Sequence, residues 1–164
     1  MKVELKAVKF YPSLSEETNC FQATIYVDGK KAGTAENRGT GGPTDYHFAD
    51  ATVEAAFCAY AKSLPAIQST IKNEDGSLFS YPMNGEHLID ELFEQHLKGK
   101  DAARIAKVAA QEKARFTAKG LQTLQIESKD TVMWVGVKDP LRVTEVVQKV
   151  AAKHKLVNAT FRLI

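Results

Sequence analysis

The sequence predicts an α+β fold: a single domain over residues 1–164, with a mixed, mostly antiparallel sheet and helices packed on one face. Apolar and polar residues alternate near both ends of the chain, as they do in half-buried strands. Apolar residues recur at helical spacing through the middle. The chain has 164 residues, 44% of them hydrophobic, so one domain can bury a core without a metal or a disulfide. The expected order is three strands, three helices, two strands, a helix and a strand.

The first three strands are expected before residue 37. Residues 3–10 alternate with one change of phase, which predicts either a bulge or an early end of the strand. Residues 21–27 alternate without a break, and Asp28-Gly29 then suits a type I′ turn. The return strand, about 30–36, is poor in large apolar residues, which predicts a position at the sheet edge.

The helices are expected between residues 50 and 120. Asp50 can cap the first helix, which Pro65 ends. Residues 66–84 are rich in turn-forming residues and are expected to form a loop or a flexible flap. Asn84 caps a second helix that Gly99 interrupts, and a third helix runs from Asp101 to a stop at Gly120.

The last 45 residues predict two strands, a helix and a strand. Leu124 and Ile126 mark one strand, and residues 131–137 are apolar on both faces, which predicts a central strand. Asp139-Pro140 is a helix start, because a capping carboxylate precedes proline at the first helical position. Residues 157–163 alternate as the final strand.

Composition excludes several classes of function. A formal net charge of +2 is too small for a whole-domain nucleic-acid footprint. The two cysteines, Cys20 and Cys58, form no C-x-x-C pair, and no zinc-binding histidine motif occurs. The N-terminus lacks the apolar core of a signal peptide, and no apolar run is long enough to span a membrane. We therefore expect a cytoplasmic protein without a metal or cofactor.

The least ordinary feature is a glycine-rich loop, residues 37–43, between a hairpin and a helix. Its glycines permit positive φ, and successive amides there can bind an anion, with help from arginine, hydroxyl and imidazole groups. The candidate ligand-binding residues are Arg38, Gly39, Thr40, Gly41, Gly42, Thr44, Tyr46 and His47. The loop is neither a P-loop nor a dinucleotide fingerprint. Its alternative role is a tight crossover that requires glycine for steric reasons.

Three other groups of polar residues are candidates for chemistry. His47 follows the glycine loop and can act as a general acid or base if a substrate lies there. Carboxylates at 86, 90, 91 and 94 crowd one helix, where a solvated face is the favoured interpretation. Arg104, Lys107 and Arg115 lie along one helical stripe that can bind a phosphate backbone, or can simply be solvated.

Two short motifs carry a resemblance. The first is Glu17-Thr18-Asn19-Cys20-Phe21-Gln22-Ala23, continuing through Tyr26-Val27-Asp28-Gly29-Lys30, and the second is Asn37 with Gly39 to Gly42. On these motifs the chain resembles small uncharacterised proteins of phages and prophages. The resemblance implies a viral setting inside a bacterial cytosol, and it implies no catalytic residue.

The sequence leaves three functions open. The first is a phage-type accessory protein that binds a host protein stoichiometrically or sequesters a small phosphorylated ligand. The second is a nucleic-acid-binding protein that uses the basic face of helix 101–119. The third is a small enzyme with His47 beside the glycine loop. A homodimer formed by pairing of sheet edges is also possible on this prediction.

Overall fold

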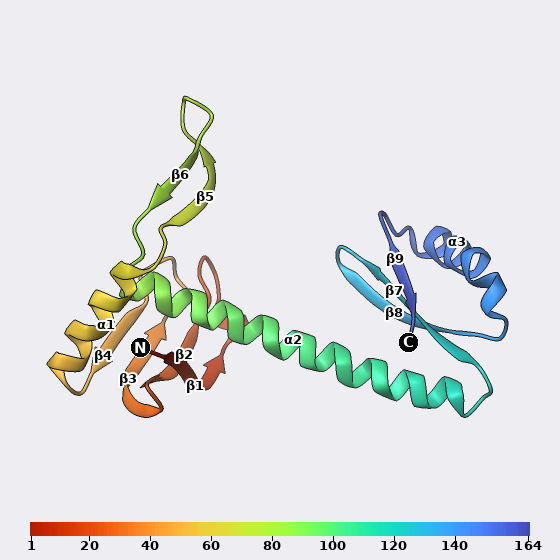
Figure 1. Ribbon diagram of the computed structural model, residues 1–164, viewed down its shortest axis with the longest axis horizontal. Helices are drawn as coiled ribbons and strands as arrows, with labels where there is room; N and C mark the ends of the chain where they lie inside the picture. The colour runs from red at the N-terminus through yellow and green to blue at the C-terminus, as the bar shows by residue number, and fades with distance from the viewer. The chain divides into compact units, whose positions relative to one another are not determined.

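A computed structural model describes all residues, 1–164, and contains three α-helices and nine strands in antiparallel sheets (Figure 1), so the predicted α+β class is confirmed. The strands are β1 (Val3–Phe10), β2 (Phe21–Val27), β3 (Lys30–Asn37), β4 (Asp45–Phe48), β5 (Ile67–Lys72), β6 (Leu78–Tyr81), β7 (Gln122–Ser128), β8 (Thr131–Val137) and β9 (Thr160–Leu163). The helices are α1 (Ala51–Ser63), α2 (Gly85–Thr117) and α3 (Val143–His154), with short 3-10 turns η1 (Pro12–Leu14) and η2 (Pro140–Arg142).

The chain divides into two compact units, which we call unit 1 (Met1–Lys98) and unit 2 (Gly99–Ile164). Each unit has a hydrophobic core of its own. Helix α2 supplies residues to both units. The prediction of one domain over 1–164 stays a prediction, and three separate sheets replace the single sheet that we expected.

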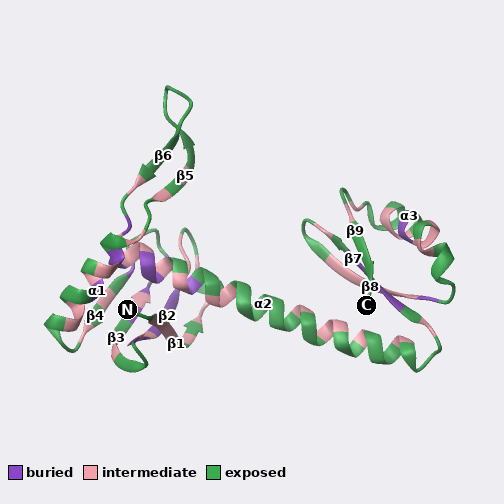
Figure 2. Cartoon of the chain, viewed as in Figure 1, coloured by how far each residue is buried: buried purple, intermediate pink, exposed green.

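Unit 1 is a four-stranded antiparallel meander, β1-β2-β3-β4, with α1 and α2 packed on one face. The alternation of β2 decides this arrangement, because Phe21, Ala23, Ile25 and Val27 are all buried while the residues between them are not. Phe57 of α1 and several apolar residues of α2 complete the core. Figure 2 shows the buried residues gathered where these helices meet the sheet. The opposite face of the sheet carries no helix.

Local sequence signals in unit 1 are confirmed. The pairing of β1 with β2 shifts register between Lys6 and Lys9 and the strand continues to Phe10, so of the two predicted explanations the structure has the bulge and not the early strand end. Asp28 and Gly29 have φ of 47° and 80°, as a type I′ turn requires. Asp50 accepts hydrogen bonds from the amides of Thr52 and Val53 and caps α1.

Two predictions for unit 1 were wrong. Strand β3 is internal, not an edge, because a fourth strand that we did not predict, β4, follows the glycine loop and pairs with it. The alternation that marks this strand covers only four residues and was overlooked in the sequence. Residues 66–84 are not an irregular loop but hold the hairpin β5-β6, whose strands pair only with each other. That this segment is a flexible flap stays a prediction.

Unit 2 packs α3 on one face of a three-stranded sheet of order β8-β7-β9. Strands β8 and β9 both pair antiparallel with β7, so α3 connects two parallel strands that have β7 between them. Leu124, Ile126, Val137 and Val147 form the core. Asp139 caps the η2 turn that leads into α3, and Gly120 adopts φ of 66° after the end of α2.

Two predictions for unit 2 were also wrong. The central strand is β7, and the more apolar β8 lies at an edge, because β9 pairs with the other side of β7. Thr123 and Gln125 of β7 are buried although they are polar. Gly99 does not interrupt the helix, since α2 continues from Gly85 to Thr117. One glycine costs a helix about 1 kcal/mol, which its many Ala, Leu, Lys and Glu neighbours offset.

Candidate functional site

The glycine-rich loop is held in place by its own chain. The backbone oxygen of Gly39 accepts hydrogen bonds from the amides of Glu16, Glu17 and Thr18, at 2.9 to 3.3 Å. The amide of Gly39 donates to Asn37 Oδ1 at 2.8 Å, and Thr18 Oγ1 donates to the same oxygen at 2.8 Å. The two motifs of the resemblance, around Thr18 and around Asn37, are therefore one hydrogen-bonded structure.

Two of the loop amides are used inside the chain and are not available to an anion. Gly41 donates its amide to Thr18 Oγ1 at 3.3 Å, and the Asn37 side-chain amide donates to the Gly42 carbonyl and to Thr44 Oγ1. The amides of Gly39 and Gly41 are thus used inside the chain. Arg38 and Thr40 are exposed and make no side-chain hydrogen bond.

Three carboxylates of α2 lie beside the glycine loop. A pocket of about 400 Å³ is lined by Gly41, Gly42 and Pro43 together with Glu86, Asp90 and Glu94 of α2. Thr44 ties the loop to these acids: its amide donates to Glu86 Oε1 at 3.3 Å and its hydroxyl to Asp90 Oδ1 at 2.5 Å. These side chains do not form a group that could hold a metal ion. Negative charge here opposes a phosphate, so the geometry gives no support to a phosphorylated ligand at the loop.

The acidic pocket has a consequence for stability. Burial raises the pKa of Asp90, and the charges of Glu86 and Glu94 raise it further, although the hydrogen bond from Thr44 acts in the opposite direction. Because the folded protein then holds this proton more tightly than the unfolded chain, ionised Asp90 destabilises the fold. This destabilisation is absent at pH values below the pKa of Asp90 in the unfolded chain. It is complete at pH values above the raised pKa of Asp90 in the folded protein.

We therefore expect Asp90→Asn to raise the melting temperature at neutral pH. The gain shrinks as pH falls through the raised pKa of Asp90, since the wild-type carboxyl is then protonated. Thermal unfolding over a pH series measures it, with Glu91→Gln, an exposed carboxylate of the same helix, as the control. A gain that stays constant across that pH range would contradict this assignment.

Tyr46 and His47 point to opposite faces of β4. Tyr46 is half-buried and packs against the core, edge-on to Phe57, and it shares a hydrogen bond with Cys58 Sγ at 3.7 Å. Burial and this hydrogen bond raise the pKa of Tyr46 to about 12. His47 is exposed on the open face of the sheet. The predicted cluster of loop amides, Tyr46 and His47 is therefore not brought together.

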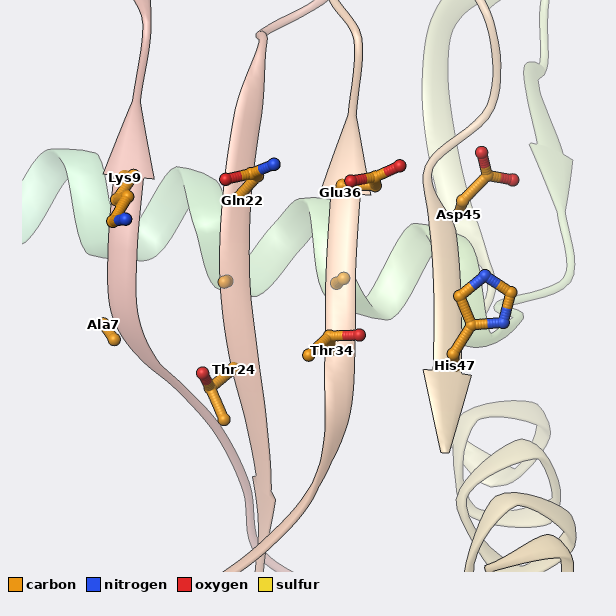
Figure 3. Close-up of a pocket in the computed structure, with 10 residues that line it drawn as sticks. Ala7, Lys9, Gln22, Thr24, Thr34, Glu36, Asp45 and His47 are labelled. Carbon is orange, nitrogen blue, oxygen red and sulfur yellow. The ribbon is translucent and has the colours of Figure 1, made fainter. Parts of the chain in front are cut away.

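His47 lines a hollow of about 470 Å³ on that open face. The strand registers place Lys9, Gln22, Glu36 and Asp45 in one row and Thr24, Thr34 and His47 in the next, as Figure 3 shows. Glu36 and Asp45 lie directly opposite each other, and neither forms an ion pair. The His47 ring makes no hydrogen bond within the chain, so no partner orients it as a general base. The hollow is a polar surface of mixed charge.

Sequence reasoning missed this surface because it missed β4. The signal was present: Tyr46 and Phe48 alternate with Asp45 and His47 over the four residues of the strand. Recognising that alternation would have placed His47 on the polar face of the sheet and Tyr46 on the face that packs against the core.

The predicted basic stripe lies on the part of α2 in unit 2. Arg104 pairs with Asp101 at 3.3 Å and Arg115 with Glu112 at 3.1 Å, and both arginine side chains remain more than half exposed. Lys107 is exposed and forms no ion pair. Exposed pairs of this kind contribute little energy, so all three cations remain accessible to another partner.

The two units have opposite charge. Unit 1 holds nine Lys or Arg and fourteen Asp or Glu, a formal net charge of −5, whereas unit 2 holds thirteen against six, a net charge of +7. The total of +2 therefore conceals a strong asymmetry.

No protein-family model, curated protein or solved structure matches the chain. None of its helices combines the length and the apolar character that crossing a membrane requires.

Proposed function

We propose that the chain is a nucleic-acid-binding protein and that unit 2 supplies the binding surface. The observation that carries the proposal is the net charge of +7 within the 66 residues from Gly99 to Ile164. A basic excess concentrated in one part of a chain attracts polyanions and raises their rate of association.

The cations of unit 2 are largely unneutralised. Eight of its nine lysines form no ion pair, and only Lys149 pairs with a carboxylate. Three of its six carboxylates, Asp101, Glu112 and Glu145, are already paired with arginine or lysine. A phosphate backbone can therefore replace counterions at the free lysines without breaking an internal ion pair.

Helix α2 gives part of this charge a regular spacing. Lys100, Arg104, Lys107 and Arg115 recur three, four or eight residues apart, so they share one helical face. A row of this kind contacts successive phosphates and positions a strand without reading its sequence.

Charge reversal locates the binding surface. We expect Lys107→Glu to weaken binding of a mixed-sequence oligonucleotide by about tenfold and to lower the salt slope by about one. Lys30→Glu in unit 1 is the matched control, since Lys30 is also exposed and unpaired, and it should leave the affinity unchanged. Fluorescence anisotropy measures both. An affinity that depends on Lys30 but not on Lys107 would place the binding surface in unit 1 and contradict the proposal.

The other functions inferred from sequence have weaker support. A small phosphorylated ligand at the glycine loop would meet the carboxylates of α2, and the amides of Gly39 and Gly41 are already hydrogen-bonded within the chain. An enzyme based on His47 lacks a group that orients the imidazole. A host-protein partner in a phage setting stays a prediction, and it is compatible with nucleic-acid binding by unit 2.

A further inference from the structure

The sheet of unit 2 has one face that α3 does not cover. Leu124, Ile126 and Val137 point toward α3 and pack in one core with Val147. Because side chains alternate along a strand, the residues between them lie on the opposite face. We call this the Trp134 face, and the strand registers place on it Thr123, Gln125, Glu127, Val132, Trp134, Gly136, Thr160 and Arg162.

Helix α2 reaches the Trp134 face only at its Gly136 end on the contacts that the structure gives. A Cβ at Gly136 would lie 2.5 Å from Cδ1 of Phe116, so this ring packs directly on the glycine. Farther along the face, Trp134 is half-buried, and Glu127, Thr160 and Arg162 are exposed. This part of the face is therefore accessible to a ligand.

Three side chains form a row across the Trp134 face. Gln125 of β7 lies directly opposite Trp134 of β8 on one side and Arg162 of β9 on the other. Trp134 is half-buried and its indole nitrogen is buried, so the ring offers carbon and not a polar group to a partner. Aromatic rings of this kind stack on nucleic-acid bases whatever the sequence.

A polar hollow of about 310 Å³ lies beside Trp134, and its lining includes Gln125, Glu127, Thr160 and Arg162. Arg162 Nη2 donates a hydrogen bond to Gln125 Oε1 at 3.4 Å. Gln125 is only 3% exposed, yet its amide nitrogen donates to no group of the chain. A buried donor without an acceptor destabilises the fold, and a ligand that accepts its hydrogen bond removes that effect.

The groups in the hollow match the edge of a base better than they match a phosphate. Arg162 and Gln125 supply donors, whereas Glu127 supplies an acceptor and forms no ion pair. The Watson–Crick edge of a base carries both acceptors and donors, and it is accessible only in a strand that is not paired. A phosphate offers acceptors alone, and the charge of Glu127 repels it.

We propose that the Trp134 face binds unpaired bases of a single-stranded nucleic acid, with one base stacked on Trp134 and a neighbouring base hydrogen-bonded in the hollow by Arg162, Gln125 and Glu127. The inference rests on the proposed function, because the net charge of +7 in unit 2 attracts the phosphates of the same strand. It adds the class of nucleic acid: a duplex keeps these base edges and base faces inside its own stack.

Tryptophan fluorescence tests the proposal in the wild-type chain, because Trp134 is the only tryptophan. A short mixed-sequence oligonucleotide is titrated as single-stranded DNA, as single-stranded RNA and as the DNA duplex. We expect at least one of the single strands to quench Trp134 and to bind about tenfold more tightly than the duplex. Quenching by either single strand supports the proposal.

Exposed residues supply variants that leave the core intact. Arg162→Ala should weaken binding of the single strand by about tenfold. Lys153→Ala removes the same charge from unit 2, on the exposed surface of α3, and should weaken binding by no more than about twofold. Trp134→Leu should also lower the affinity by about tenfold, whereas Trp134→Phe keeps a ring for stacking and should retain most of it.

Two outcomes would overturn this proposal and leave nucleic-acid binding by unit 2 in place. One is a chain that binds duplex and single strand equally, with unchanged Trp134 fluorescence and a lower affinity in Lys107→Glu. The other is an equal loss of affinity in Arg162→Ala and Lys153→Ala, which would reduce the role of Arg162 to its charge. Failure to bind any of the nucleic acids would overturn the proposed function and this inference together.

Discussion

Replacing Gly39 with alanine is expected to destabilise unit 1 by roughly 4 kcal/mol. Gly39 has φ of 86°, a conformation that costs alanine about 1 to 2 kcal/mol. A Cβ there would also lie 2.2 Å from the Leu14 carbonyl oxygen and 2.8 Å from Cys20 Cβ, both closer than atoms can pack. Relief requires backbone movement, which disturbs the hydrogen bonds between Gly39 and residues 16–18.

The neighbouring glycines provide graded controls for this prediction. At Gly41 a Cβ meets only the flexible side chain of Glu17, so alanine costs about 1 kcal/mol for its φ of 84°. At Gly42 nothing lies within 4 Å and φ is not positive, so alanine should be neutral. Urea denaturation of the three variants measures the order. Equal costs at all three positions would contradict a steric requirement centred on Gly39.

The second large effect is expected from Phe93→Ala, which should destabilise unit 1 by about 4 kcal/mol. Phe93 is 1% exposed and stacks on Phe21 with ring centroids 4.1 Å apart, while Phe10 meets it edge-on at 5.5 Å. Removing the ring leaves a cavity between β1, β2 and α2 that these stiff aromatic neighbours cannot fill.

The aromatic residues also report which unit unfolds. All five tyrosines lie in unit 1, and the single tryptophan, Trp134, lies in unit 2. Because each unit has its own core, Phe93→Ala should lower the tyrosine-detected transition and leave the tryptophan-detected transition in place. If both transitions move together by the same amount, the chain unfolds as the single domain that the sequence predicted.

Local structure in this chain follows from local signals. The Asp50 cap, the Asp28-Gly29 turn and the Asn84 cap, whose Oδ1 accepts the His87 amide at 2.8 Å, each depend on a few adjacent residues. Strand order does not, because it depends on which segments meet in space. Thr123 and Gln125 show this: they are polar, yet only 1% and 3% exposed, since neighbouring strands and not their own hydrophobicity bury them.

For the candidate sites too, the sequence shows what depends on adjacent residues and not what depends on contacts between distant residues. The sequence identified the glycine loop but could not show that Thr18, nineteen residues before Asn37, occupies its hydrogen-bonding groups. It also identified the stripe through Arg104, Lys107 and Arg115. The charge of unit 2 stayed hidden, because it becomes visible only when the boundary at Lys98 and Gly99 is known.

Salt dependence tests the central claim, nucleic-acid binding by unit 2, most directly. The binding constant of the wild-type chain for a mixed-sequence oligonucleotide is measured over a series of salt concentrations. We predict a linear fall of log K with log salt, with a slope of about −0.7 to −0.9 for each phosphate neutralised, so that several contacts give a slope of roughly −3 or steeper. Binding that is absent at low salt, or that does not change with salt, would contradict the account.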